Sequence, residues 1–306
     1  MKKGFIAFTT LVLLGLSSTS QAKQDVCVFD LLGKAGESYK MMEEWALAAK
    51  AWNTDIQLTA YQNEELAERD FQNGKCDAVF LTAMRARQFN KFAGSIDALG
   101  GVEYEVGGIT QIGPAYIFVN DRSINTIEKG RGKKFAVLSY DKAQIAAVKR
   151  VGATPVLSDI SDFILKFNQG KVDMVGAPAY AFKPLELSKG LGSNGAMFNF
   201  PVLNVTADLI FNTSKFSPGF GSLSREWFLK KMPKQFEMVK KQEETIPNKY
   251  RLNLSKEDKE RYQKLLRDTR LELTKQGVYD PTMMSVLKRA RCTVDRTNFE
   301  CSLAGE

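Results

Sequence analysis

The feature that most constrains the fold of this chain is a segment that occurs twice. Residues 71–83 read FQNGKCDAVFLTA and residues 167–179 read FNQGKVDMVGAPA, with a constant offset of 96 (167 minus 71). The positions that match are Phe71, Gly74, Lys75, Asp77, Val79 and Ala83, which recur as Phe167, Gly170, Lys171, Asp173, Val175 and Ala179.

Both copies show the same order of local signals. An amphipathic segment ends at a glycine, which suits a helix C-terminus because glycine adopts the left-handed conformation without a Cβ penalty. Lys-x-Asp then leads into a short apolar run that is typical of a buried parallel strand. One copy in each half of the chain predicts two similar α/β lobes. The alternative is that the motif marks two unrelated helix-to-strand turns.

Strand-like and helix-like segments alternate on both sides of a glycine-rich junction at residues 94–108. This alternation predicts an α/β protein with two lobes and parallel-rich sheets. In the C-terminal helical region, Pro233 predicts a kink or a split and Pro281 a helix start. The expected divisions are lobe I at 23–108, a hinge crossing at 109–120, lobe II at 121–200, a return crossing at 201–221 and C-terminal helices at 222–306.

The N-terminus has the pattern of a secretory signal peptide. Lys2 and Lys3 precede an apolar run at residues 4–16, and residues 20–22 read Ser-Gln-Ala, close to an A-x-A cleavage site. A membrane anchor is disfavoured because a spanning helix needs about 20 apolar residues. We therefore expect residues 1–22 to be a signal peptide and the mature protein to be a soluble exported protein.

The formal net charge of +8 falls to about +6 without Lys2 and Lys3 (8 minus 2). A modest basic excess favours small anions or anionic surfaces as partners. Nucleic acid is not expected as a partner, because the chain has no known binding motif and its basic residues alternate with acidic ones. The chain has no histidine, which excludes histidine-based catalytic triads and makes a zinc site improbable. We expect no cofactor and no enzymatic activity.

The cysteines are even in number, as in many exported proteins with disulfides. Four cysteines allow three pairings. We predict Cys27–Cys76, because both belong to neighbouring strands of lobe I, and Cys292–Cys301, because they close a short polar loop.

The ligand-binding candidates follow the predicted strands, since ligands of open α/β sheets bind beyond the carboxyl ends of strands. Arg85 and Arg87 follow the first repeat, where a guanidinium would suit a carboxylate; the alternative is a pair of solvated side chains. The aromatic residues after the second repeat would line a pocket wall or pack between the lobes. The full set is Thr82, Arg85, Arg87, Tyr140, Pro178 and Tyr180.

Two glycine-containing loops offer further anion-binding patterns. Residues 32–38 enter a predicted helix and form either an anion cradle or an ordinary loop with an N-cap. Residues 190–195 match the dinucleotide fingerprint GxGxxG by letter, but they follow a helix-like segment. A flexible turn is therefore the better interpretation of this second loop.

Several strings resemble the AdeT family of Gram-negative bacteria, which is labelled both as solute-binding proteins and as components of resistance-nodulation-division efflux linked to aminoglycoside resistance. These strings are AYIFVNDRSIN (115–125), APAYAFKPLELSKGLG (177–192), GVYDPTMM (277–284) and RARC…C (289–301). The resemblance covers nearly all of the mature chain. The architecture more distantly resembles the periplasmic binding proteins of tripartite ATP-independent transporters, which implies a two-lobed periplasmic-binding-protein-like (type II) fold.

This resemblance implies capture of a small polar or anionic solute between two lobes for delivery to an inner-membrane transporter. The alternative it implies is an accessory role in efflux. Aminoglycosides are polycations and would need an acidic cleft, and the clustered carboxylates expected near the hinge are Asp97, Glu103 and Glu105. The sequence departs from the family in a shorter stretch near residues 101–104. It departs from the transporter binding proteins in residues 177–180, which lack their usual carboxylate-reading arginine.

Overall fold

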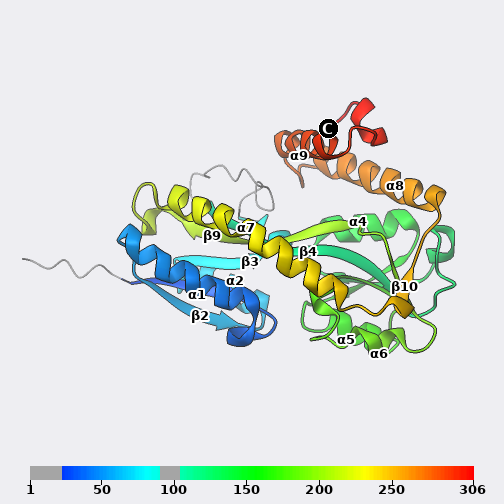
Figure 1. The fold of residues 1–306 in the computed structure, drawn as a ribbon, viewed down its shortest axis with the longest axis horizontal. Coiled ribbons are helices and arrows are strands. Elements are labelled where there is room, and N and C mark those ends of the chain that lie inside the picture. Colours follow the sequence, from blue (N-terminus) through cyan, green and yellow to red (C-terminus); the bar gives the residue numbers. More distant parts are fainter. Residues whose placement is uncertain (1–22, 90–103) are drawn as a thin grey trace, which may run out of the picture.

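The computed structural model describes residues 23–89 and 104–306. Within these residues the protein has two α/β lobes that share one continuous sheet of ten strands (Figure 1). The strands are β1 (Gln24–Phe29), β2 (Ile56–Tyr61), β3 (Ala78–Thr82), β4 (Tyr104–Val119), β5 (Lys134–Leu138), β6 (Thr154–Ser158), β7 (Met174–Pro178), β8 (Ala196–Phe198), β9 (Leu203–Asn212) and β10 (Arg251–Leu252). The helices are α1 (Glu37–Ala49), α2 (Glu64–Gln72), α3 (Ala83–Ala86), α4 (Lys142–Val151), α5 (Phe163–Asn168), α6 (Leu187–Leu191), α7 (Phe220–Glu244), α8 (Lys256–Lys275) and α9 (Pro281–Val294).

The two lobes repeat the same strand arrangement. Lobe I contains the parallel order β2-β1-β3, and lobe II contains the parallel order β6-β5-β7, so the first strand of each lobe lies in the middle. β3 then pairs antiparallel with β9, and β7 pairs antiparallel with β4. The predicted α/β class with parallel-rich sheets is confirmed.

The repeated segments have equivalent structures. In each copy the helix ends at a glycine in the left-handed conformation, with φ of +72° at Gly74 and +68° at Gly170. The phenylalanine that opens each copy is buried, Phe71 in the core of lobe I and Phe167 in that of lobe II. The interpretation as two unrelated turns is therefore wrong.

The aspartate of each repeat also has one role in both lobes. Asp77 Oδ2 accepts a hydrogen bond from the amide of Asp25, the second residue of β1, at 3.0 Å. Asp173 Oδ2 accepts one from the amide of Lys134, the first residue of β5, at 2.8 Å. Each aspartate thus ties the start of its own strand to the start of the neighbouring parallel strand.

The lobes are joined by β4, β9 and α7, which run along the length of the molecule (Figure 1). β4 pairs with β9 over most of its length and with β7 near its end. α7 lies across β4, and Phe228 packs so closely that a Cβ at Gly108 would lie 2.0 Å from its ring. A glycine is required there because a side chain would displace the helix.

The predicted split at Pro233 is wrong, because α7 runs through this residue as one helix of 25 residues. An interior proline costs about 3 kcal/mol in an isolated helix. On either side of Pro233, Phe228, Gln235 and Val239 are buried. Packing on β4 outweighs the local preference of the proline. Pro281 does begin α9, as predicted.

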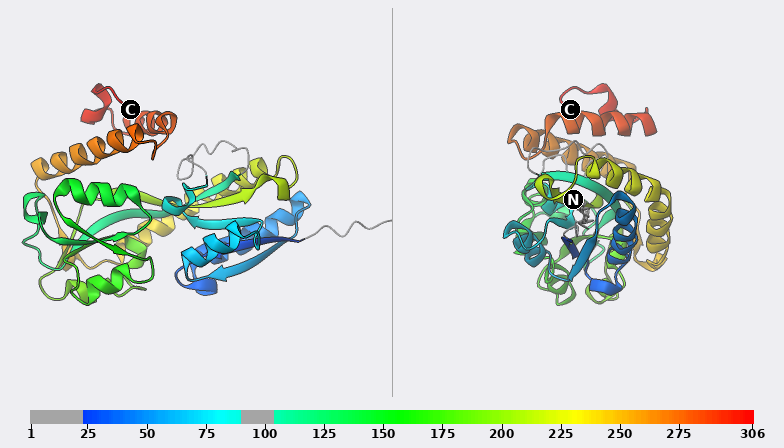
Figure 2. Two further views of the ribbon diagram at one scale, coloured as in Figure 1. Left: turned by 180° about the vertical axis from the view of Figure 1, so that it is seen from behind. Right: turned by 90° about the vertical axis from the view of Figure 1, so that its left-hand side faces the viewer.

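Beyond α7 the chain forms a C-terminal arm, residues 256–306. α8 lies beside α4 of lobe II, and α9 turns back above the middle of the molecule (Figure 2). Within the described ranges 23–89 and 104–306, no helix has the length and apolar character of a membrane span.

Both predicted disulfides are present. Cys27 in β1 is bonded to Cys76 ahead of β3, with their Cα atoms 5.8 Å apart. Cys292 in α9 is bonded to Cys301 in the C-terminal turn, with a Cα separation of 5.7 Å. One disulfide therefore joins neighbouring elements of lobe I and the other closes the end of the arm.

Candidate functional site

The carboxyl ends of strands from both lobes meet at one place. Tyr140, two residues after β5, donates its hydroxyl hydrogen bond to Glu64 Oε2 at 2.9 Å. Glu64 is the first residue of α2 in lobe I. The guanidinium of Arg85, which follows β3, lies 3.8 Å from the centre of the Tyr140 ring. These contacts join lobe I to lobe II directly.

Arg85 is neither solvated nor free. Its Nε lies 3.3 Å from Glu64 Oε2, and its Nη1 contacts Glu68. The Arg85 side chain is 9% exposed and the Glu64 side chain is fully buried. The guanidinium is therefore already paired with two carboxylates of its own lobe, one helical turn apart on α2.

Glu64 is the most enclosed carboxylate of this contact. Besides Arg85 and Tyr140, its Oε1 accepts a hydrogen bond from the amide of Thr82 at 2.7 Å. Burial nevertheless raises the pKa of Glu64, although these partners favour the ionised form. The Thr82 hydroxyl is also buried beside Glu64 and Tyr140 but makes no hydrogen bond of standard geometry.

Tyr180 reaches the same place from the turn after β7. Burial raises its pKa, and the carboxylates of Asp30 and Glu64 raise it further, which places them within electrostatic reach of the tyrosine. Its hydroxyl has no hydrogen bond to any residue in the described ranges. Pro178 ends β7 opposite Ala115 and is half-buried.

Asp30 directly follows β1 and determines the conformation of the next loop. Its carboxylate accepts hydrogen bonds from the amides of Leu32, Ser38 and Tyr39, at 2.9, 3.0 and 3.3 Å. Burial raises the pKa of Asp30 in spite of these bonds. Loop 32–38 is therefore capped by the protein's own carboxylate, which occupies the predicted anion cradle.

Arg87 lies at the edge of the contact and is more accessible. Its Nη2 is 3.8 Å from Asp141 Oδ1, and its side chain is 24% exposed. Asp141 also caps α4 by accepting from the amides of Ala143 and Gln144. The guanidinium of Arg87 lies 5.2 Å from the ring centre of Tyr279, so lobe I, lobe II and the C-terminal arm meet here.

We name the central group of side chains the interlobe cluster. It consists of Asp30, Glu64, Glu68, Thr82, Arg85, Tyr140 and Tyr180. The sequence predicted four of these residues, while Arg87 and Pro178 lie at the margin. The sequence did not identify the three carboxylates Asp30, Glu64 and Glu68. The available signal was that Glu64 and Glu68 lie four residues apart on one face of the helix that follows a predicted strand.

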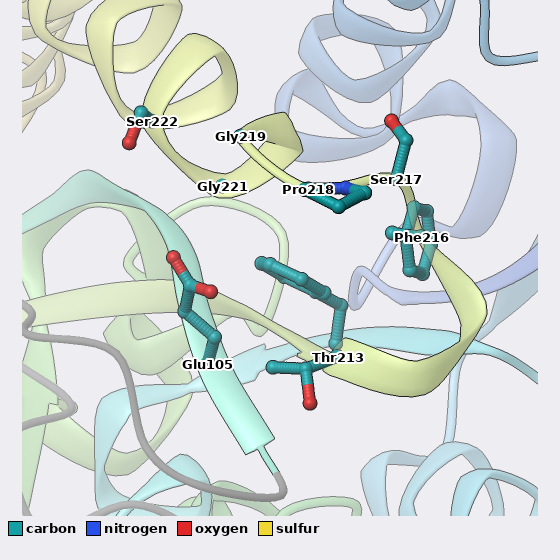
Figure 3. A pocket seen from close by; sticks show the side chains of 9 residues that line it. Glu105, Thr213, Phe216, Ser217, Pro218, Gly219, Gly221 and Ser222 are labelled. Carbon is teal, nitrogen blue, oxygen red and sulfur yellow. The ribbon is translucent and has the colours of Figure 1, made fainter.

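Of the carboxylates expected near the hinge, Glu105 is the one within the described residues, and it lies outside the interlobe cluster. Asp97 and Glu103 lie outside the described residues. Glu105 pairs with Arg225 at the start of α7 and lines a hollow of about 230 Å³ (Figure 3). The other walls are Phe211, Thr213, residues 216–219, Gly221 and Ser222. The hollow is smaller than most ligand pockets, and none of its lining residues comes from lobe II.

Comparisons with known proteins agree on one family. The family described as "Solute-binding protein AdeT 1/2" matches residues 41–103 and 101–306. A relative in Acinetobacter baumannii, named "Probable solute-binding protein AdeT1", is 41% identical over 304 residues, covering 91% of this chain and 100% of the relative. The two matched segments meet at residues 101–103, in the stretch where this chain is expected to be shorter than the family.

Solved structures show the same fold. A TRAP periplasmic solute-binding protein from Desulfovibrio salexigens with bound orotic acid has a TM-score of 0.66, with 14% identity, 90% of this chain covered and 99% of that chain. One from a Sulfitobacter species with bound β-D-galacturonate also has a TM-score of 0.66, with 11% identity and coverage of 87% and 98%. None of these descriptions refers to efflux.

Proposed function

Because the chain belongs to the AdeT 1/2 solute-binding protein family, we propose that it binds its solute between the two lobes, at the interlobe cluster. The lobes close on the solute by bending at β4, β9 and α7, and closure removes the solute from water. The protein performs no chemistry on the solute. In this proposal the carboxyl ends of β1, β3, β5 and β7 surround the solute, and the strand order of the sheet supports that arrangement.

The observation that supports this proposal most strongly is the direct contact of strand ends from different lobes. The hydroxyl of Tyr140 in lobe II bonds to Glu64 in lobe I, and Arg85 stacks on the same tyrosine. These side chains separate when the lobes open, so a solute between them would be recognised by both halves.

We assign the six predicted residues to this site in two groups. Thr82, Arg85, Tyr140 and Tyr180 form its floor within the cluster, and Arg87 and Pro178 form its rim. In this proposal lobe I is 23–108, lobe II is 121–200, and 109–120 and 201–221 are the crossings. The helices at 222–306 brace both lobes.

The proposed location is the periplasm, after removal of residues 1–22 as a signal peptide. Two disulfides support an oxidising compartment. The membrane partner is an inner-membrane transporter that accepts the closed, loaded form. An efflux role has no support in the family description or in the relatives' names.

Native mass spectrometry of protein released directly from the periplasm tests both parts of this proposal. The expected result is a chain that begins at Lys23 and carries one small molecule, which is lost after denaturation. A Tyr140→Phe, Arg85→Lys double variant should show the chain mass expected for its own sequence but lose most of the adduct. A solute-free protein from cells grown on several carbon and nitrogen sources would contradict solute capture.

A further inference from the structure

The end of lobe II opposite to the strand ends that carry the interlobe cluster is strongly basic. Three segments meet there, at the starts of β5, β6 and β7, and they are residues 129–134, 149–154 and 169–173. The amide of Gly132 bonds to the carbonyl of Gly152 at 2.8 Å, and the amide of Asp173 bonds to the carbonyl of Lys134 at 2.9 Å. We name these three segments the basic end. They contain seven lysine or arginine side chains and one carboxylate, that of Asp173.

Most of these cations have no acidic partner. Arg150 pairs with Glu272 of α8, and the ammonium of Lys129 donates a hydrogen bond to Asn125. The other five form no salt bridge with a residue in the described ranges, and they are Arg131, Lys133, Lys134, Lys149 and Lys171. Four of these five are exposed and Lys133 is half-buried. The positive charge of the basic end therefore faces solvent.

The carboxylates around the basic end are used within the protein. Asp173 accepts a hydrogen bond at 2.8 Å from the amide of the first residue of β5. At the margin, Glu128 pairs with Arg261 of α8. Asp121, also at the margin, accepts a hydrogen bond from the side-chain amide of Asn194. These carboxylates reduce the positive charge at the margin, but the unpaired cations outnumber them.

The repeat shows that the fold does not require this charge. In lobe I the segments at the starts of β1, β2 and β3 are residues 23–25, 50–55 and 72–77. They carry three cations and three carboxylates, which are Lys23, Lys50, Lys75, Asp25, Asp55 and Asp77. The amide that the repeat aspartate binds belongs to Asp25 in lobe I and to Lys134 in lobe II. Equivalent backbone therefore carries no net charge in lobe I and a net charge of +6 in lobe II (seven minus one).

The composition of the basic end favours a lipid surface over a protein as its partner. The buried centre of a protein interface is depleted in charged residues and enriched in aromatic ones. None of the exposed large hydrophobic side chains in the described part of the chain belongs to the basic end. A bilayer with anionic lipids attracts lysine and arginine without an apolar contact, because its phosphates form a continuous negative layer.

We propose that the basic end binds the anionic headgroups of a membrane surface. The starts of β5, β6 and β7 then face the bilayer, and the interlobe cluster lies at the opposite ends of these strands. Because the basic end belongs to lobe II alone, the protein can bind the membrane in both its open and its closed form. This inference does not rest on the proposed solute capture, and it needs no solute.

Sedimentation with lipid vesicles tests this inference. Protein released from the periplasm is mixed with vesicles of phosphatidylcholine alone, or of phosphatidylcholine with an equal amount of phosphatidylglycerol. We expect the protein to sediment with the anionic vesicles only. The bound fraction should fall when the salt concentration rises from about 20 mM to about 150 mM, because salt screens attraction between exposed charges.

Two variants with the same net charge locate the binding surface. Neutralisation of three cations of the basic end should weaken vesicle binding roughly tenfold or more; these substitutions are Arg131→Gln, Lys133→Gln and Lys171→Gln. The matched control removes three exposed cations of lobe I and should bind as wild type does; its substitutions are Lys34→Gln, Lys40→Gln and Lys50→Gln.

A second variant of the basic end guards against a folding defect in the first. Lys134→Gln combined with Lys149→Gln changes two other exposed side chains and should also weaken binding several-fold. Equal losses in the lobe I control would overturn the inference, because binding would then follow net charge alone. Failure of the wild type to sediment with anionic vesicles at low salt would also overturn it. Neither result would bear on whether the interlobe cluster captures a solute.

Discussion

Burial of charge at the interlobe cluster gives Arg85 a structural role besides the solute-binding role that we propose for it. Arg85→Ala leaves Glu64 and Glu68 buried without their cation. Removal of one partner from a buried pair costs about 3 to 5 kcal/mol, and we expect a loss of that size in the free energy of unfolding in urea. Arg150→Ala breaks the exposed pair with Glu272 and should cost at most about 1 kcal/mol. Equal losses for the two variants would contradict the burial of the Arg85 pair.

Glu64 gives stability a distinctive dependence on pH. Its pKa is raised in the folded protein, so the folded state binds a proton more tightly than the unfolded state. The contribution is present at low pH and is lost as pH rises from the ordinary glutamate value of 4.5 through the raised value. Wild type should therefore lose stability relative to Glu64→Gln as the pH rises above the ordinary glutamate value of 4.5 in solute-free protein.

Thermal unfolding of the two proteins across this range checks the sign. A difference in Tm that moves in favour of wild type with rising pH would mean that Arg85 dominates and that the pKa of Glu64 is lowered.

At this scale the sequence predicted positions better than partners. The sequence identified Thr82, Arg85 and Tyr140 because each comes just after a predicted strand. The direction of a strand determines at which edge of the sheet the next residues lie. The pairing of Arg85 with Glu64 and Glu68 depends on how α2 packs beside β3, which no local pattern encodes. The sequence did not identify Asp30 for the same reason. Its carboxylate binds backbone amides of the following loop, and only the folded loop brings those amides to it.

At the scale of elements, the two repeated helix-to-strand segments, 71–83 and 167–179, allow the same substitution to be compared at equivalent positions. A Cβ at Gly74 or Gly170 would meet no atom within 4 Å, so only the left-handed backbone opposes alanine there. Gly74→Ala and Gly170→Ala should each cost about 1 to 2 kcal/mol in unfolding free energy. Asparagine, which tolerates this conformation better, should cost less at both positions. Full tolerance of alanine at one position alone would contradict the equivalence of the two units.

The disulfides differ in the length of chain that they close. Cys27–Cys76 spans a sequence separation of 49 and Cys292–Cys301 one of 9. Loop-closure entropy assigns them about 4 and roughly 3 kcal/mol. Paired Cys→Ala replacement should therefore destabilise the protein more at Cys27 and Cys76, as measured by urea unfolding. The reverse order would show that the C-terminal arm is the stability-limiting part.

The sequence predicted whether a segment is a helix or a strand more readily than whether a helix is continuous. Periodicity and the glycine signals located most strands and helices of both lobes. The sequence missed the short strands β8 and β10. These segments are strands because β8 pairs with β4 and β10 pairs with β8, and such distant pairing leaves no pattern within two or three residues. The sequence also predicted a kink or a split at Pro233, whereas α7 continues through this residue because long-range packing on β4 outweighs the local preference.

For the whole molecule, the account rests on two lobes that open and close about β4, β9 and α7. The repeat predicted the two lobes, and the strand order confirms their likeness. The sequence could not predict how closely the lobes approach, since this depends on contacts such as Tyr140–Glu64 between distant segments. Closure is therefore the property to measure.

The most direct measurement is the distance between spin labels on the two sides of the interlobe contact. Glu65→Cys in α2 and Lys142→Cys in α4 are exposed positions beside Glu64 and Tyr140, and the four native cysteines are held in disulfides. Solute-free protein should show a broad distribution of distances. The low-molecular-weight fraction of a periplasmic extract should narrow this distribution to its short end. An identical distribution with and without the extract would contradict closure of the lobes on a solute.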